Sequence, residues 1–430
     1  MRNDGQDRPA DRPLDRRTLL ASGLGALGGL AFLSRDGRAA VRLLAPSAAR
    51  ADDDAPRTLV LLQLSGGNDG LSTVVPFGDD LYAKARSSTR IAAGEALALD
   101  GYRGLHPELK RLHALYGQGS LAVVEGAGYP KPIRSHFESM EVWHTARGEG
   151  RDSGEGWVGR LCDAAWPKDA TPELVVHLGA TAPYSLYSTR HPALAFQTPA
   201  SYQWVASERE DKAMYERAGA GGKDGPAGDA KPKTGGAAVL DRLRGVLSDA
   251  QESSLRIRRA AAGYRPRVEY PQDELGNVLR VAAALIDARI GARVISVELG
   301  GFDSHNDQRR QHDGLMRRLD AGLAAFLADL RGTRAGDACV VVAFSEFGRR
   351  VAENGSRGTD HGTAGPMLVA GTAVQGGLYG KHPSLAELDD GDLVHTTDFR
   401  SVYGEVVEGW FGARAETVLG GRYPALPLLG

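Results

Sequence analysis

The feature that most constrains the fold is a series of short, continuous apolar runs rich in β-branched residues. They occupy residues 58–64, 121–125, 173–178, 293–299 and 338–344. A run without polar alternation is typical of a strand buried on both faces, as in a parallel sheet that helices cover. The sequence therefore predicts a central, mostly parallel sheet.

Helical patterns separate these runs. Apolar residues recur every three or four positions within 105–116, 275–286 and 315–330. This spacing places them on one face of a helix. Strands that alternate with such helices are typical of α/β proteins, so we expect a three-layer α/β/α sandwich that forms a single domain over residues 52–430.

One internal segment interrupts the alternation. Residues 218–237 are rich in Gly, Ala, Lys, Pro and Asp and contain no large apolar side chain. Such a composition predicts a flexible surface insertion. A charged helical stretch follows it at 239–262.

The first 51 residues are typical of an export signal. Arg16 and Arg17 precede the apolar stretch 18–33, which is shorter than the roughly 20 residues that span a bilayer. Ala49 and Ala51 then form a small-residue cleavage site. The paired arginines indicate the twin-arginine route, with its translocase as a partner during export. The mature protein is then periplasmic, extracellular or in the cell envelope, without a stable membrane span. An uncleaved anchor is the alternative.

Composition excludes one class of function. The chain has 52 basic and 54 acidic side chains, and this balance lacks the basic excess of a nucleic-acid-binding protein. Its two cysteines, Cys162 and Cys339, are too few for a disulfide framework or a cysteine-based zinc site. We expect both to be buried, unpaired thiols.

Acidic and imidazole side chains follow the predicted strands. In open α/β sheets, ligands gather at the carboxyl ends of the strands. The side chains that follow predicted strands are Asp69 beside Asn68, Asp303, His305 and Glu346, and a fourth loop directly before the apolar run 366–370 adds Asp360 and His361. Mixed carboxylate and imidazole ligands suit a divalent ion such as zinc, manganese or calcium. Such an ion can polarise a phosphoryl or sulfuryl oxygen and activate a hydroxyl or water.

These positions also have structural interpretations. Asn68, Asp69 and Gly70 are the residues that a tight turn needs. Asp303 is equally suited to the N-terminus of a helix. Glu346 follows a buried strand, and a carboxylate with a purely structural role there needs a partner. Their joint placement favours a metal site more than any one of them does.

A candidate nucleophile comes from residues 132–138. Ser135 and Glu138 have the spacing of a capping box, in which both side chains satisfy backbone donors at a helix start. A hydroxyl at that position also lies where backbone N–H groups favour an anion. Ser135 is therefore a candidate nucleophile, and Arg134 or His136 could contact the anionic group. Both interpretations of Ser135 remain open.

Taken together, these motifs resemble an exported bacterial family known as domain of unknown function 1501. The resemblance is carried by residues 65–76, 134–137, 300–305, 345–349 and 359–366. More distantly, the family looks like the alkaline phosphatase and sulfatase superfamily. That resemblance implies an alkaline phosphatase-like core, two metal ions and hydrolysis of phosphate or sulfate esters. It also implies Ser135 as nucleophile and the carboxylates and histidines named above as ligands.

The chain departs from the superfamily pattern at Phe347, where those enzymes carry a metal-binding histidine. A phenyl ring cannot ligate, so the site holds one metal, or Asp360 supplies a replacement ligand, or catalysis is lost. Two functions are therefore open. One is a metal-dependent hydrolase acting on a small anionic ester or a decorated polymer, and the other is a non-catalytic exported binding or assembly protein.

Overall fold

The computed structural model describes residues 56–147, 154–168, 171–202 and 236–430. The export signal predicted at 1–51 lies outside the described residues. So does the insertion predicted at 218–237, apart from its last two positions. The chain divides into two units, Met1–Asp53 and Asp54–Gly430, and the described residues belong to the second.

A nine-stranded sheet runs through the second unit. Its strands follow the order β11-β5-β10-β9-β1-β8-β6-β7, and β14 pairs with β5. The bounds are β1 Thr58–Leu64, β5 Leu121–Gly128, β6 Val175–His177, β7 Leu194–Ala195, β8 Val294–Leu299, β9 Cys339–Phe344, β10 Gly365–Ala370, β11 Gly377–Tyr379 and β14 Thr397–Asp398. Within this sheet as described, β10 alone runs antiparallel to its neighbours, and the prediction of a mostly parallel sheet is confirmed.

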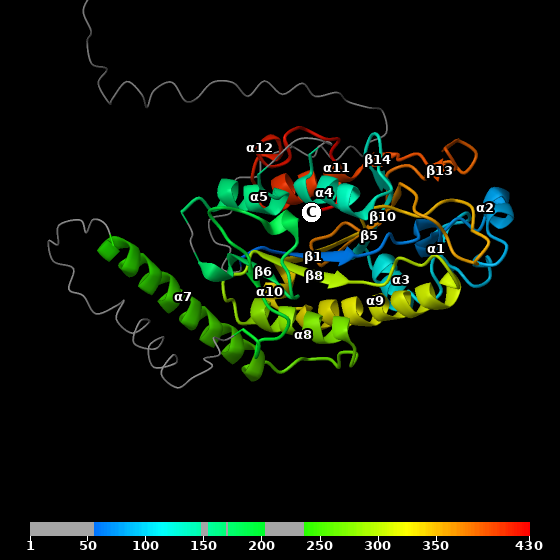
Figure 1. Cartoon of the computed structure of the whole chain (residues 1–430). Coiled ribbons are helices and arrows are strands. Elements are labelled where there is room, and N and C mark those ends of the chain that lie inside the picture. The colour runs from blue at the N-terminus through cyan, green and yellow to red at the C-terminus, as the bar shows by residue number, and fades with distance from the viewer. Residues whose placement is uncertain (1–55, 148–153, 169–170, 203–235) are drawn as a thin grey trace, which may run out of the picture. The chain divides into compact units, whose positions relative to one another are not determined.

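The central strands fix where loops can meet. β1 pairs in parallel with both β8 and β9, so that Leu61 lies between Ser296 and Val342. The carboxyl ends of these three strands and the amino end of β10 therefore share one edge of the sheet. In Figure 1 the arrowheads of β1 and β8 point toward this edge, on the side of α1 (Gly70–Thr73) and α2 (Asp80–Ala85).

Helices cover both faces of the sheet, because successive residues of a strand point to opposite sides. Val60 and Leu62 belong to one buried cluster, and Leu59 and Leu61 to another. One face carries α3 (Lys110–Gly117), α8 (Glu274–Asp287) and α9 (Gln308–Leu330), and the other carries α4 (His136–Thr145), α5 (Trp157–Ala165), α11 (Phe399–Gly404) and α12 (Ala415–Leu419) (Figure 1). The expected three-layer α/β/α sandwich is confirmed.

The remaining elements complete the unit. They are β2 Val74–Val75, β3 Leu97–Ala98, β4 Gly104–Leu105, η1 Pro172–Leu174, η2 Tyr184–Leu186, α7 Gly236–Gly263, α10 Arg334–Asp337, β12 Leu388–Asp389, β13 Asp392–Leu393 and η3 Glu405–Trp410. The charged helix expected at 239–262 is α7, which packs on α8. One helix prediction began too early, since Leu105 lies in β4. Pro107 explains this, because a proline disfavours helical backbone at the residue before it.

Both cysteines lie within the described residues, buried and unpaired, as expected. Burial raises the pKa of Cys339 to about 12, so this thiol stays protonated at neutral pH. None of the helices in the described ranges is both long enough and apolar enough to cross a bilayer.

Candidate metal centre

Four loops meet at the carboxyl edge of the central strands. Three of them follow β1, β8 and β9, and the fourth precedes β10, while α4 contributes its first turn. This arrangement gathers the side chains of His136, Asp303, His305, Glu346, Arg349, Asp360 and His361.

Three imidazole nitrogens and one carboxylate converge within this group. The Nε2 atoms of His305 and His361 each lie 3.0 Å from Asp303 Oδ1 and 3.0 Å from each other. His136 Nε2 lies 3.7 Å from Asp303 Oδ2. One ligand atom each from His136, Asp303 and His361 falls within a spread of 4.8 Å. For comparison, two ligands of a tetrahedral zinc ion with bonds of about 2.0 Å are roughly 3.3 Å apart.

Each imidazole is held from behind through its Nδ1 atom. The three pairs are His136 with Glu346 Oε1 at 2.9 Å, His305 with Asp360 Oδ1 at 3.1 Å, and His361 with the Arg134 carbonyl oxygen at 2.9 Å. Carboxylate and carbonyl oxygens only accept, so each Nδ1 donates to its oxygen when the ring carries its proton there, the form that a histidine takes when its Nε2 atom binds a metal. In the neutral rings, all three Nε2 atoms are then lone-pair donors.

Lone pairs that face one another repel unless a cation lies between them. The arrangement of three Nε2 atoms beside Asp303 therefore fits a bound cation, and outer acceptors on Nδ1 are usual for metal-bound histidine. The donor chemistry fits zinc or manganese. Calcium takes six to eight oxygen ligands, so an imidazole-rich site disfavours it.

Arg349 places a fixed positive charge in the same site. Its buried guanidinium donates to Asp303 Oδ1 at 2.7 Å, and also to the carbonyl oxygens of Gly67 at 2.7 Å and Thr359 at 2.8 Å. Burial alone would raise the pKa of Asp303, but the hydrogen bond from Arg349 and the positive charge of its guanidinium outweigh burial and lower that pKa well below its ordinary value. Arg349 was not among the site residues predicted from the sequence, although it ends the 345–349 motif.

Glu346 and Asp360 lie behind the converging atoms and not among them. Glu346 is buried, and its Oε1 accepts the Gly66 N–H at 2.9 Å as well as the His136 proton. Asp360 Oδ1 accepts from Asn354 Nδ2 at 3.2 Å in addition to His305. Both carboxylates thus orient imidazoles.

Asp69 lies outside the converging group. Its carboxylate forms a two-point ion pair with the equally buried Arg86, at 2.7 Å and 3.0 Å, and accepts from Ser72 at 2.6 Å. The neighbouring Asn68 is also engaged, because its Oδ1 lies 3.0 Å from His312 Nε2. The structure therefore places Asp69 in a buried ion pair, and no motif in the sequence pointed to Arg86 as its partner.

Ser135 begins α4 directly beside His136. It occupies the N-cap position, but among the described residues its hydroxyl accepts no capping hydrogen bond. The capping box expected with Glu138 is therefore not formed. The Arg134 guanidinium points elsewhere, since it lies 3.0 Å from Asp390 and 3.3 Å from Asp392.

Phe347 forms an apolar floor beneath the imidazoles. Its ring centroid lies 4.9 Å from that of His136 and 4.7 Å from that of His361. Two facts account for the glycine at position 67. A Cβ atom there would lie 2.3 Å from the Phe347 ring, and the backbone has a φ of +79°, which favours glycine. A phenyl ring in this position supports the histidines sterically and adds no ligand.

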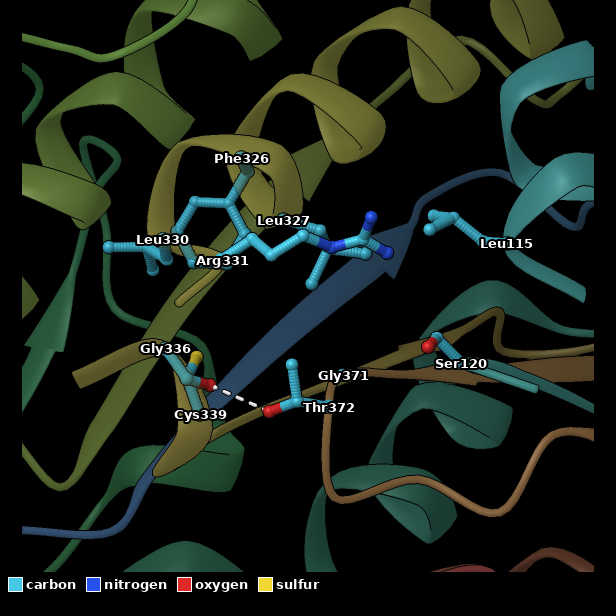
Figure 2. A pocket seen from close by; sticks show the side chains of 10 residues that line it. All are labelled: Leu115, Ser120, Phe326, Leu327, Leu330, Arg331, Gly336, Cys339, Gly371 and Thr372. Carbon is cyan, nitrogen blue, oxygen red and sulfur yellow. Dashed lines mark hydrogen bonds between the residues drawn. The ribbon is translucent and has the colours of Figure 1, made fainter. Parts of the chain in front are cut away.

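The site is open to the surface and lies apart from the cavities of the fold. One cavity, of about 20 Å³, lies beside Cys339 and Thr372, where β9 begins and therefore at the opposite edge of the sheet. Figure 2 shows the residues that line it. This volume suffices for about one water molecule. Two larger depressions, of about 380 and 550 Å³, lie along α7, α8 and α9 and contain none of the converging residues.

Fold and site together define an α/β/α protein with a mostly parallel sheet and a candidate metal centre at the carboxyl edge of its central strands. The chain belongs to the family described as "Protein of unknown function (DUF1501)", whose model matches residues 114–403. The family expected from the sequence motifs is confirmed. A search of curated proteins found no match to the chain.

Several solved structures are similar to this chain. One is a putative sulfatase from Bacteroides thetaiotaomicron VPI-5482, with 9% identity over 87% of this chain and 77% of that chain and a TM-score of 0.36. Another is a protein in the alkaline phosphatase superfamily from Vibrio parahaemolyticus, with 9% identity, coverages of 86% and 70%, and a TM-score of 0.36. A third is a 2-O GAG sulfatase, with 10% identity, coverages of 86% and 76%, and a TM-score of 0.36.

Proposed function

We propose that this protein is an exported, metal-dependent hydrolase of phosphate or sulfate esters. The observation that carries the proposal is the convergence of three Nε2 atoms on Asp303, with every Nδ1 atom held by an outer oxygen. A catalytic metal site requires several ligand atoms that are held in place with their lone pairs directed toward one point, and these four side chains provide them.

His136, Asp303, His305 and His361 would hold the ion. A bound divalent cation polarises an ester oxygen and favours loss of a proton from a nearby hydroxyl. Glu346 and Asp360 fix the rings of His136 and His305 and increase the basicity of their Nε2 atoms. Arg349 keeps Asp303 ionised at every physiological pH.

Ser135 supplies the nucleophile in this proposal. Its hydroxyl makes no capping bond within the described chain and adjoins the ligand His136. The N–H groups in the first turn of α4 favour negative charge at the same place, so they would stabilise the charge that develops on the ester oxygens. Attack by Ser135 Oγ would expel the alcohol, and water would then release phosphate or sulfate.

One observation favours a non-catalytic binding or assembly protein instead. Arg349 already donates to Asp303 Oδ1 at 2.7 Å, and this contact neutralises the carboxylate of the converging group. Without an ion, protonated His305 and His361 would complete a purely structural cluster around Asp303.

Metal content and turnover together separate the two functions. We expect the purified full chain to carry one zinc or manganese ion, which His361→Ala removes and His113→Ala does not. His113 is the matched control, because its Nε2 lies 2.9 Å from the Ala98 carbonyl oxygen, outside the site. The wild type should hydrolyse 4-nitrophenyl phosphate or 4-nitrophenyl sulfate, and Ser135→Ala should not. A metal-free wild type that is inert toward both esters would leave only the binding protein.

Export belongs to the same proposal. Arg16, Arg17 and the Ala49 to Ala51 cleavage site support passage through the twin-arginine translocase and removal of residues 1–51. The product would then act in the periplasm, in the cell envelope or outside the cell.

A further inference from the structure

Two arginines beside the candidate metal centre share one exposed carboxylate. Asp390 Oδ2 accepts from Arg134 at 3.0 Å and from Arg350 at 3.2 Å. The Asp390 side chain is 71% exposed, whereas the two arginines are 40% and 33% exposed. A carboxylate that is held by two guanidinium groups and open to solvent occupies the position of a bound anion.

Asp390 reaches the arginines from the tip of the β12–β13 hairpin. Asp390 and Gly391 form its two-residue turn, with φ values of +50° and +83°. The neighbouring Asp392 is buried and lies 3.3 Å from Arg134 and 3.7 Å from Arg350. Asp392 therefore keeps the arginines in place and balances one of their two charges. Asp390 balances the other from the solvent side.

Both arginines are tied by their backbones to the proposed metal ligands. The Arg134 carbonyl oxygen accepts from His361 Nδ1 at 2.9 Å. The Arg350 N–H donates to the Asp360 carbonyl oxygen at 3.0 Å, and Asp360 in turn holds His305. The backbones of both arginines thus border the metal centre, and their guanidinium groups extend to Asp390 and Asp392 of the adjoining hairpin.

We propose that Arg134 and Arg350 form a second anion subsite, which Asp390 fills until a substrate carrying two or more anionic groups displaces it. This inference rests on the proposed function, because it takes the ester cleaved at the metal centre to be one of those groups. The other group, a phosphate or a sulfate, would bind the two guanidinium groups. The substrate class is therefore a polyanionic ester rather than a singly charged one.

Exchange of Asp390 for a substrate anion is energetically easy. Ion pairs at an exposed surface contribute little to stability, because water and salt screen them. A phosphate or sulfate can accept hydrogen bonds from two guanidinium groups at once, as Asp390 does, and its ester group would in addition be attracted by a cation held by His136, Asp303, His305 and His361. Displacement leaves Asp390 at a solvated turn, where an unpaired carboxylate costs little.

The test measures anion binding to the metal-stripped full chain by calorimetry, so a failure of catalysis cannot affect it. Inorganic pyrophosphate and sulfate are titrated separately and show which anion the subsite prefers. The variants are Asp390→Asn and the double variant Arg134→Gln with Arg350→Gln. The matched controls are Glu108→Gln and Arg317→Gln, which break another exposed ion pair, of 2.9 Å, outside the site.

We expect Asp390→Asn to tighten binding of at least one anion about 2- to 5-fold, because a competing carboxylate has gone. The double arginine variant should weaken the same binding about 10-fold or more, and the controls should leave it unchanged. The proposal is overturned if neither anion binds Asp390→Asn more tightly than the wild type. It is equally overturned if Asp390→Asn lowers only the melting temperature, since the ion pairs would then serve the fold alone.

Discussion

At the scale of single residues, the orientation of each candidate ligand histidine depends on an oxygen that accepts from its Nδ1 atom and does not contact the proposed ion. Glu346 holds His136 through Nδ1, is buried, and also accepts the Gly66 N–H. We expect Glu346→Gln to keep the fold, because an amide oxygen can still accept both protons. It should nevertheless weaken metal affinity about 10- to 100-fold, since a neutral partner makes the imidazole less basic. Competition with a chelator measures this, and unchanged affinity would refute the orienting role.

Asp329→Asn is the control for that experiment. Asp329 is likewise buried and accepts from Tyr264 and Tyr270, at 2.6 Å and 2.8 Å, but it does not belong to the converging group. Its replacement should lower stability and leave metal affinity as it was. The pair of variants therefore separates loss of an outer ligand partner from loss of a buried carboxylate in general.

Ser135 gives a second prediction at this scale. Because its hydroxyl makes no capping bond, Ser135→Ala should change the free energy of unfolding by less than the roughly 1 kcal/mol that an N-cap contributes, yet abolish ester hydrolysis. Thr333→Ala is the reverse case, since Thr333 accepts the Gly336 N–H at 2.9 Å at the start of α10. It should cost about 1 kcal/mol of stability and spare turnover. Urea denaturation and an aryl ester assay measure both. A large stability loss in Ser135→Ala would make this serine structural.

The chain positions of the candidates could be predicted at this scale, but their pairing could not. Asp303 could be placed at this edge because the carboxyl ends of buried parallel strands meet there. His361 precedes β10 and reaches the same edge because that strand runs antiparallel to its neighbours. Whether a carboxylate faces a metal or an arginine depends on side chains that arrive from elsewhere in the fold. Arg86 reaches Asp69 from the end of α2, and no periodic pattern in the sequence predicts that contact.

At the scale of elements, the Asp69–Arg86 pair joins the loop after β1 to the end of α2. Burial alone would raise the pKa of Asp69, but Arg86 outweighs it and lowers that pKa below the ordinary 3.8. The pair therefore stabilises the fold fully above pH 3.8, and this contribution is lost as the pH falls toward the lowered value. We expect Asp69→Asn to cost about 3–5 kcal/mol at pH 7, because Arg86 is left buried and unpaired. Urea denaturation at pH 7 and pH 3 should show the deficit shrinking in acid, and a constant deficit would contradict this account.

The elements themselves were predictable where the hydrophobic pattern was unambiguous. The run at 58–64 is β1 to the residue, and the run at 338–344 differs from β9 by one position. Errors arose where local backbone chemistry overrides the pattern. Pro172–Leu174 forms a 3₁₀ turn, so β6 starts two residues later than its apolar run. Two-residue strands such as β12 and β13 are held by tertiary contacts and leave no periodic signal.

At the scale of the whole molecule, metal binding should be visible as stability. A ligand that binds only the folded chain adds about 2.7 kcal/mol when its free concentration is 100 times its Kd. We therefore expect chelation to lower the melting temperature of the wild type. In His361→Ala, chelation should have no effect, because the site has lost a ligand. Scanning calorimetry with and without chelator measures both, and equal melting temperatures for the wild type would exclude a tightly held ion.

Export in the folded state is the last expectation at this scale. The two cysteines are buried and unpaired, so folding does not depend on an oxidising compartment, and the chain can fold and take up its ion before it is translocated. Changing both Arg16 and Arg17 to lysine should leave the precursor inside the cell, because the route depends on the arginine pair. That retained precursor should resist protease as the mature protein does, which shows that it folded before export failed. Cell fractionation measures where the precursor is located, and limited proteolysis then measures whether it is folded. If the double lysine variant is still exported, the twin-arginine route is refuted. If the retained precursor is sensitive to protease, folding before export is refuted.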